Sequence, residues 1–192
     1  MRRLGQVITA GMLLVQALWA ANLTAQQRTL ELDPAKTQIH YVLGATAHTV
    51  HGVFQMTSGV INFDPTTGVA SGAIIVDAAS GNSGSEGRDK KMDKDILQNE
   101  QYHDIVFYPK KVIGSVPSQG SSQIQVQGVF RLHGSDHDLT MMIPVQINGK
   151  EVSATAHFAV PYVAWGLKDP STFILRVAKE VTVEIDTRGT LK

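Results

Sequence analysis

Alternation of apolar and polar residues with a period of two dominates this chain from residue 29 onward. The clearest example lies at residues 152–160, where one face carries Val152, Ala154, Ala156, Phe158 and Val160. Residues 124–132 and 141–147 show the same alternation. Because successive side chains of a strand point to opposite faces, these stretches predict half-buried strands. Helical spacing is rare, so the chain predicts an all-β fold, an antiparallel barrel or sandwich.

Two turn motifs predict which strands are neighbours. Asn148-Gly149-Lys150 separates residues 139–148 from residues 151–160, and Asn-Gly between alternating apolar residues is a strong hairpin motif. The segment 64–68, which contains Pro65 and Gly68, connects residues 60–63 to residues 69–77 in the same way. The sequence therefore predicts two antiparallel hairpins.

The pattern breaks at residues 78–101 and again at residues 162–172. Residues 79–87 are rich in Gly and Ser and predict a loop, whereas Met92, Ile96 and Leu97 lie at helical spacing within a charged stretch. The last strand is predicted over residues 173–186, and Lys179 falls on its apolar face. We therefore expect one domain, residues 26–192, with about eight or nine strands and one short helix.

The N-terminus has the pattern of a secretory signal peptide. Arg2 and Arg3 precede an apolar run over residues 7–21, and small and polar residues follow. The run is shorter than the ~20 residues of a spanning helix, and we expect cleavage after Ala25. Residues 1–25 thus predict an exported, secreted protein, and loss of the two arginines makes the mature chain weakly acidic.

Composition excludes several functions. The chain has no Cys, so disulfides, a catalytic thiol and Cys-ligated metals are excluded. Its 17 basic and 17 acidic residues are scattered, without the basic face that nucleic-acid binding requires. Neither a phosphate-binding Gly loop nor a G-x-S-x-G nucleophile motif occurs. The sequence therefore predicts neither an enzyme nor a bound cofactor.

Histidine pairs leave one alternative open. His48 and His51 are close in sequence, as are His133 and His137, and imidazole is a common metal ligand. Residues three apart in a strand face opposite sides, and the second pair spans a turn. The spacing therefore predicts no metal site, although a metal protein or enzyme would follow if these side chains converged.

Several motifs, in order along the chain, resemble those of the YceI-like family. They are His48-Thr49-Val50-His51-Gly52-Val53-Phe54, residues 58–65, Arg88-Asp89-Lys90-Lys91-Met92, Tyr108-Pro109, residues 126–134 and Trp165-Gly166-Leu167-Lys168-Asp169-Pro170-Ser171. The resemblance implies an extended lipocalin-like antiparallel β-barrel of about eight strands, exported to the periplasm. It also implies a non-enzymatic binding protein. Its lumen would hold a polyisoprenoid lipid, such as an isoprenoid quinone or a polyprenyl phosphate.

Candidate ligand-binding residues follow from residue type and the expected strand faces. The expected lumen residues are Phe54, Ile75, Phe107, Phe130, Ala154, Ala156 and Phe158, with Gly52, Ala73 and Gly128 making room for a channel. The expected mouth residues are His48, His51, Arg88, Lys90, Tyr162 and Trp165. A shift of one residue in register would invert each of these faces. A fully packed barrel that acts through its surface is the alternative, and transient membrane contact and a dimer both stay open.

Overall fold

The computed structural model describes residues 27–46 and 48–192, so the expected signal peptide lies outside the described residues. The strands are β1 Arg28–Leu32, β2 Gln38–Gly44, β3 Thr49–Phe63, β4 Ala70–Asn82, β5 Asp104–Ile113, β6 Gly120–Leu132, β7 Ser135–Asn148, β8 Glu151–Val160 and β9 Val181–Leu191. The helical elements are η1 Pro34–Lys36, α1 Glu86–Lys91 and the π-helix η2 Met92–Leu97. None of the helices in this described part is long and apolar enough to cross a membrane.

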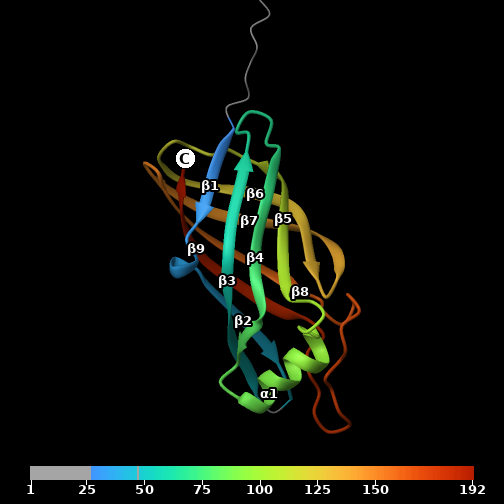
Figure 1. Cartoon of the computed structure of the whole chain (residues 1–192). Coiled ribbons are helices and arrows are strands. Elements are labelled where there is room, and N and C mark those ends of the chain that lie inside the picture. The colour runs from blue at the N-terminus through green and yellow to red at the C-terminus, as the bar shows by residue number, and fades with distance from the viewer. Residues whose placement is uncertain (1–26, 47) are drawn as a thin grey trace, which may run out of the picture.

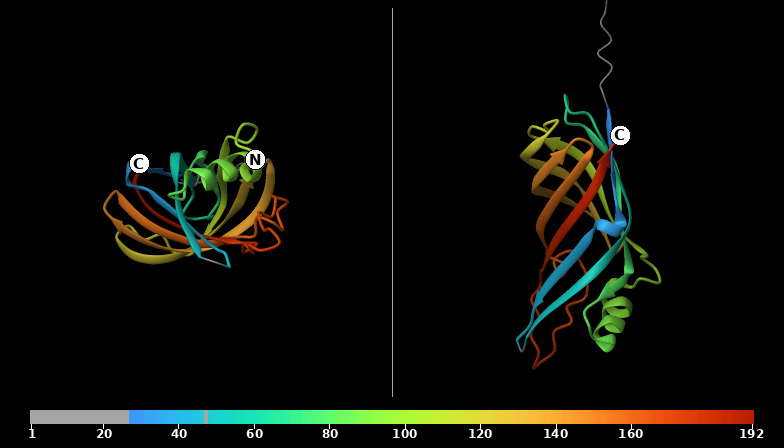
Figure 2. Two further views of the ribbon diagram at one scale, coloured as in Figure 1. Left: turned by 90° about the horizontal axis from the view of Figure 1, so that it is seen from below. Right: turned by 90° about the vertical axis from the view of Figure 1, so that its left-hand side faces the viewer.

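The strands form one closed, elongated antiparallel barrel (Figures 1 and 2). The sheet order is β1-β3-β2-β9-β8-β7-β6-β5-β4, and β3 also pairs with β4, which closes the barrel. Strands β1 and β2 both lie between β3 and β9, β1 pairing near one end of β3 and β2 near the other. Nine strands therefore occupy eight positions around the barrel, which confirms the predicted fold class.

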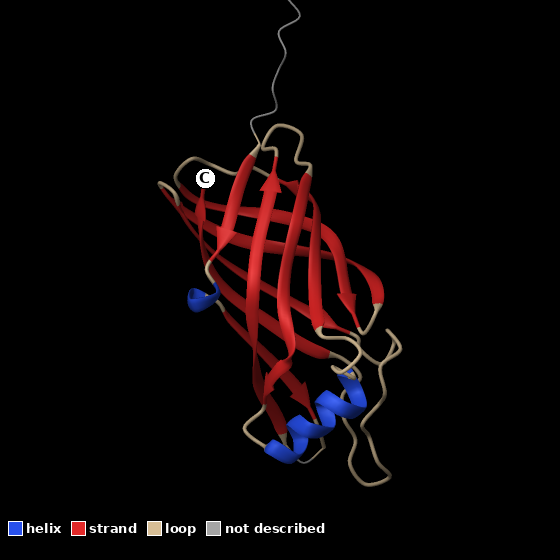
Figure 3. Ribbon diagram, viewed as in Figure 1, coloured by secondary structure: helices blue, strands red, loops and turns tan. Residues whose placement is uncertain are grey.

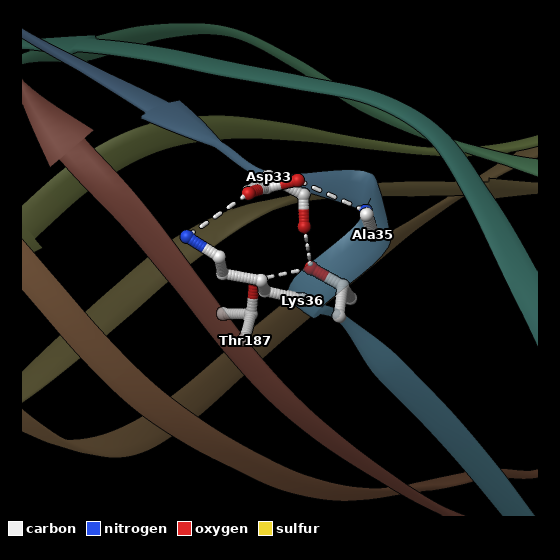
Figure 4. Close-up of polar contacts among 5 residues, drawn as sticks. Asp33, Ala35, Lys36 and Thr187 are labelled. Atoms are coloured by element: carbon white, nitrogen blue, oxygen red, sulfur yellow. Dashed lines mark hydrogen bonds and ion pairs between the residues drawn. The ribbon is translucent and has the colours of Figure 1, made fainter.

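A short 3-10 turn separates β1 from β2 (Figure 4). The Asp33 carboxylate accepts a hydrogen bond from the Ala35 amide at 3.0 Å and lies 3.5 Å from the Lys36 ammonium. The Thr37 hydroxyl donates to the Asp33 carbonyl at 2.8 Å and lies 2.6 Å from the Thr187 hydroxyl of β9. Because Pro34 cannot donate to a strand ladder, the chain turns here and then rejoins the same position in the barrel.

Both predicted hairpins are confirmed. In the β7–β8 hairpin Asn148 pairs with Glu151, and Gly149 takes the positive φ of 62° that this tight turn requires. In the β3–β4 hairpin Phe63 pairs with Ala70. The Asp64 carboxylate accepts bonds from the Thr66 amide and the Thr67 hydroxyl, each at 2.8 Å, and these bonds lower the pKa of Asp64.

Three predicted strand boundaries are wrong, among them the end of the last strand, which lies at Leu191 and not at residue 186, although the predicted helical segment is present. Strand β4 continues to Asn82, where the sequence predicted a loop, because Asn82 still pairs with Val53 and the Ser80 hydroxyl accepts a bond from the Gln55 amide. Strand β9 begins only at Val181, because the backbone of residues 172–178 bonds within its own turn and to residues 44–46. Lys179 therefore lies outside β9 and is exposed to solvent.

The barrel interior divides into two apolar clusters. One lies toward α1 and η2, which cover that end of the barrel (Figure 3), and contains buried Leu97, Leu132, Val160, Tyr162 and Leu167. The other contains Phe107, Val126 and Met141, packed against neighbours from β4 to β8. Phe130 and Phe158 contact both clusters, so these two rings mark the boundary between the two halves of the interior.

Candidate functional site

A cavity of about 810 Å³ lies in the half of the barrel that α1 and η2 cover. Its wall comes from inward positions of β2, β3, β4, β5, β6, β8 and β9, from α1 and η2, and from residues of the segment 167–177. The apolar lining residues include Ile39, Tyr41, Leu43, Val50, Phe54, Ile96, Leu97, Ile105, Phe130, Phe158, Val160, Leu175, Val177, Val181, Val183 and Ile185. A concave apolar space of this size is typical of sites for small organic or lipid ligands.

Phe130 and Phe158, here called the aromatic floor, line the cavity on the side that packs against the second apolar cluster. Their ring centroids lie 5.9 Å apart in an edge-to-face arrangement at 68°. The Trp165 ring packs against Phe130 with the ring centroids 5.8 Å apart, and Trp165 is not among the residues that line the cavity. Edge-to-face pairs are a favoured aromatic geometry, so the floor is well packed.

Small residues do not widen the lumen as the sequence predicted, either beyond the floor, where Phe107, Val126 and Met141 pack together, or in the cavity half. A Cβ atom at Gly128 would lie 2.6 Å from the Phe107 ring, and one at Gly52 would lie 2.4 Å from the Tyr41 ring. Each glycine therefore accommodates an aromatic ring from a neighbouring strand. Among the described residues, one half of the interior therefore holds a buried apolar cluster and the other half holds the cavity.

Arg88 is the most firmly held cation in the cavity wall. Its Nε donates to the Ser83 hydroxyl at 2.7 Å, and one Nη donates to the Ser83 carbonyl at 2.8 Å. The Asp89 carboxylate in turn accepts from the Ser83 amide at 2.9 Å and from the Ser83 hydroxyl. This network fixes the guanidinium at the edge of the cavity, where an anionic or strongly polar group would find a charged donor.

Further charged groups surround the same opening. Lys91 and Lys168 line it, as do Asp95 and Asp169. The Asp169 carboxylate accepts a bond from the Ser171 amide at 2.9 Å, and hydrogen bonds from Ser171 lower the pKa of Asp169. The opening is therefore polar and carries both signs of charge, in contrast to the apolar wall further inside.

Tyr41 brings a hydroxyl group into the wall without a charge. Its ring lies 5.4 Å from that of Phe54, and its hydroxyl contacts the Met92 sulfur at 3.7 Å. Burial raises the pKa of Tyr41, and the nearby Asp89 carboxylate raises it further. The group thus stays neutral at physiological pH, which keeps this wall suited to an apolar ligand.

Tyr162 anchors the loop that follows β8. Its side chain is buried in the cavity wall, and its hydroxyl donates to the Ala178 carbonyl at 2.7 Å. Burial, with a smaller contribution from Asp169, raises the pKa of Tyr162 from its ordinary 10.0 to about 12. This hydrogen bond therefore joins the start of the loop, at Tyr162, to its end, at Ala178.

This pKa predicts a pH dependence of stability above neutrality. Because the folded pKa lies above the unfolded value, the stabilisation is complete below pH 10.0 and is lost as the pH rises toward about 12. We expect Tyr162→Phe to remove this part of the decline and to cost about 1 kcal/mol below pH 10. Urea unfolding of both proteins across this pH range measures the effect, and parallel pH profiles would contradict it.

The structure separates the predicted lumen residues into three groups. Phe54, Phe130 and Phe158 line the cavity. Phe107 and Ala156 belong to the packed cluster beyond the floor, and Ala154 lies still further along β8, opposite Val145. The prediction for Ile75 is wrong: its neighbour Ile74 packs in the interior and Val76 lines the cavity, so Ile75 faces outward. The prediction for Ala73 is also wrong: Ala73 precedes the inward-facing Ile74 and pairs with exposed Val60, so it faces outward.

The predicted mouth residues also divide. His48, Arg88 and Tyr162 line the cavity. His51 does not, because it lies between buried Val50 and Gly52 and so faces the outside of the barrel. Lys90 is exposed on α1 and pairs with Glu86. Trp165 does not line the cavity: its ring packs against Phe130 and stacks on His137, with the Trp165 and His137 centroids 4.1 Å apart.

Sequence reasoning missed Lys91, Lys168 and the polar segment around Asp169. Spacing along the helix could have found the first of these, since Arg88, Lys91 and Asp95 recur every three or four residues and therefore share a face. The loop residues carried no comparable periodicity. Their position depends on the hydrogen bonds that bind residues 172–178 to residues 44–46.

The histidines do not converge. His48 lies at the cavity mouth and His51 outside the barrel, whereas the His133 ring lies 3.0 Å from the Gln98 side chain and His137 stacks on Trp165. Across residues 27–46 and 48–192, no group of three His, Asp or Glu side chains is placed to hold a metal ion.

A second groove, of about 640 Å³, lies over β7, β8 and β9. It is more open, and its walls include Lys36, Gln38, Gln146, Asp186 and Arg188. The polar lining and open shape give an apolar molecule little surface to bury. The cavity inside the barrel, with its apolar lining, is therefore the better candidate site.

A closed antiparallel barrel with an apolar cavity behind a polar opening defines a class of small proteins that hold a ligand in the barrel interior. The YceI-like domain matches residues 30–188, which span most of the sequence. The chain belongs to the YceI-like family. A comparison with curated proteins gave no match.

Solved structures share this fold at low sequence identity. BcnA from Burkholderia cenocepacia has a TM-score of 0.66 at 19% identity, covering 82% of this chain and 98% of BcnA. A polyisoprenoid-binding domain from Saccharophagus degradans has a TM-score of 0.63 at 13% identity, covering 84% and 97% respectively. The YceI protein of Campylobacter jejuni gives 0.54 at 14%, covering 71% and 80%. This likeness is one of fold.

Proposed function

We propose that this protein binds one polyisoprenoid lipid, with the apolar tail in the cavity and the polar head at the mouth. The observation that carries the proposal is the cavity of about 810 Å³, apolar inside and lined by Arg88, Lys91 and Lys168 at its opening. The name of the Saccharophagus degradans neighbour, a polyisoprenoid-binding domain, supports the same ligand class. Each CH₂ group buried from water contributes about 0.8 kcal/mol, so a few isoprene units suffice for binding.

The aromatic floor sets how much of the lipid is enclosed. A tail that enters past Lys91 meets Phe130 and Phe158 and stops there, so a short isoprenoid or the end of a longer one fits. An isoprenoid quinone and a polyprenyl phosphate both satisfy these requirements. The role is that of a non-enzymatic carrier, since binding alone requires no reacting group.

We further propose that the protein acts outside the cytoplasm. The basic residues Arg2 and Arg3, followed by the apolar run over residues 7–21, support export. A carrier in the periplasm would keep a water-insoluble lipid enclosed while it moves between membranes. N-terminal sequencing of the exported protein tests the expected start at Gln26.

Native mass spectrometry of the protein recovered from the cells that export it tests the ligand. We expect one isoprenoid per chain, identified after organic extraction, and re-uptake by the delipidated protein. A protein that carries no lipid and takes up neither a quinone nor a polyprenyl phosphate would overturn the proposal.

The charged mouth predicts a difference between head groups. Lys91→Gln removes a cation from the cavity wall, whereas Lys90→Gln, one residue away, changes an exposed side chain outside it. Charge-assisted hydrogen bonds contribute about 1.5–3 kcal/mol, so we expect Lys91→Gln to weaken binding of a polyprenyl phosphate about tenfold or more. Fluorescence titration with both ligands measures this, with quinone affinity and the Lys90→Gln protein as controls. Equal losses in the two variants would contradict a phosphate at Lys91.

A further inference from the structure

The most exposed large apolar side chains among the described residues lie together in one turn. Phe173 is 94% exposed and Ile174 is 87% exposed. They occupy the two central positions of a turn whose ends are joined by a bond from the Thr172 amide to the Leu175 carbonyl at 2.8 Å. Gly, Asn, Asp and Pro usually fill such positions, so two bulky apolar residues here are unusual.

Hydrogen bonds hold this turn in place. The Leu175 amide donates to the Thr172 hydroxyl at 3.0 Å. Behind the turn, the Arg176 carbonyl accepts bonds from the Thr46 amide at 2.9 Å and the Thr46 hydroxyl at 3.1 Å. The turn is therefore tied to the chain between β2 and β3, which presents the two apolar side chains at a fixed place.

The turn lies at the mouth of the cavity. Thr172 and Leu175, the residues on either side of Phe173 and Ile174, line the cavity themselves. In Figures 1 and 2 the orange-to-red loop after β8 extends from the barrel at the same end as α1. An apolar surface that meets the Phe173–Ile174 tip would therefore lie next to the opening.

Around the tip, four cations stand against three carboxylates, so the net charge there is weakly positive. Lys91, Lys168, Arg176 and Lys179 are exposed, against the exposed carboxylates of Asp95 and Glu180. Asp169 is half-buried, and its carboxylate is hydrogen-bonded to Ser171. A surface of anionic phospholipid complements this arrangement, because its head groups attract Lys and Arg while its interior accepts the apolar tip.

We propose that the Phe173–Ile174 tip inserts into the surface of an anionic lipid bilayer and holds the cavity mouth against it. The size of the tip favours a bilayer over a protein partner, since a specific protein interface buries about 1,200–2,000 Å² and two side chains supply only a small part of that area. The proposal rests on the proposed lipid-binding function, because it assigns the place where the lipid enters and leaves.

Vesicle sedimentation of the exported, processed protein tests the proposal. We expect binding to vesicles of phosphatidylglycerol and phosphatidylethanolamine, weaker binding to pure phosphatidylcholine, and loss of about tenfold or more of the binding in Phe173→Ser/Ile174→Ser. The control is Val69→Ser/Met142→Ser, which removes two other exposed apolar side chains, 62% and 51% exposed, away from the cavity mouth. It should bind like the unaltered protein.

A second measurement separates this proposal from the proposed function. Uptake of an isoprenoid added from detergent should be unchanged in the tip variant, whereas transfer from vesicles should slow about tenfold or more. Lipid uptake without vesicle binding by the unaltered protein would overturn the bilayer proposal and leave the function standing. Transfer that depends on the tip only when the donor membranes carry proteins would overturn it in favour of a protein partner. Vesicle binding without any lipid uptake would support the tip and overturn the function.

Discussion

Replacing Val183 by Trp is expected to abolish lipid uptake while the barrel stays folded. Val183 lies on β9 between Tyr41 of β2 and Phe158 of β8, and its side chain lines the cavity. An indole ring at this position extends into the open space in front of the aromatic floor. It displaces several methylene groups of ligand at about 0.8 kcal/mol each, which corresponds to about a hundredfold loss of affinity.

The neighbouring residue provides the matched control. Thr182 lies on the same strand, between cavity-lining Val181 and Val183, and therefore faces outward. Thr182→Trp should leave lipid affinity unchanged, and both variants should unfold within about 1.5 kcal/mol of the unaltered protein. Titration with a fluorescent isoprenoid and urea unfolding measure both quantities. Full uptake by Val183→Trp would place the ligand elsewhere than in the cavity.

Because the cavity occupies only one half of the barrel interior, the structure also changes which substitutions are expected to block the site. The sequence favours Ala154 and Ala156 as positions where a larger side chain would block the lumen, because they are small and lie on the apolar face of their strand. In the structure Ala156 packs beyond the aromatic floor, and Ala154 lies further still. A larger side chain at Ala156 would therefore crowd the packed cluster, at a cost of about 1–3 kcal/mol, and leave the cavity open.

Strand faces could be predicted wherever the sequence alternates without interruption. Residues 152–160 and 124–132 carry such patterns, and the predicted inward residues Phe130 and Phe158 do line the interior. In β4 the run Ala73-Ile74-Ile75-Val76 is apolar on both faces, so nothing in the sequence distinguishes Ile74 from Ile75. Register shifts between β3 and β4 near Met56 further separate this strand from any simple alternation.

The two halves of the interior could not be predicted, because they depend on pairing across strands. Whether Gly128 opens a channel or accepts a ring depends on its neighbour on β5, and the pairing of Pro109 with Gly128 brings Phe107 over it. The position of residues 172–178 likewise depends on bonds to Thr46, which is more than 100 residues earlier in the chain. Local patterns carry no information about such contacts, so neither the division of the interior nor the position of residues 172–178 could be predicted from the sequence.

Truncating Phe158 is expected to remove part of the floor and extend the cavity into the packed half. The Phe158 ring contacts Phe130 edge to face and packs against both apolar clusters. Phe→Ala substitutions in packed interiors cost about 3–5 kcal/mol, because apolar contacts are lost and a void remains. We expect urea unfolding of Phe158→Ala to show a loss in this range.

The same variant should also change which lipid is bound. With the floor opened toward Phe107 and Met141, a longer part of the isoprenoid tail should fit inside the barrel. Because the lipid binds only the folded state, bound lipid should also restore part of the lost stability. Competition between isoprenoids of different length, read by native mass spectrometry, should shift toward the longer tail. Phe173→Ala is the control, because Phe173 is 94% exposed, and it should alter neither stability nor length preference. An unchanged preference in a folded Phe158→Ala protein would show that the floor does not limit the depth of the tail.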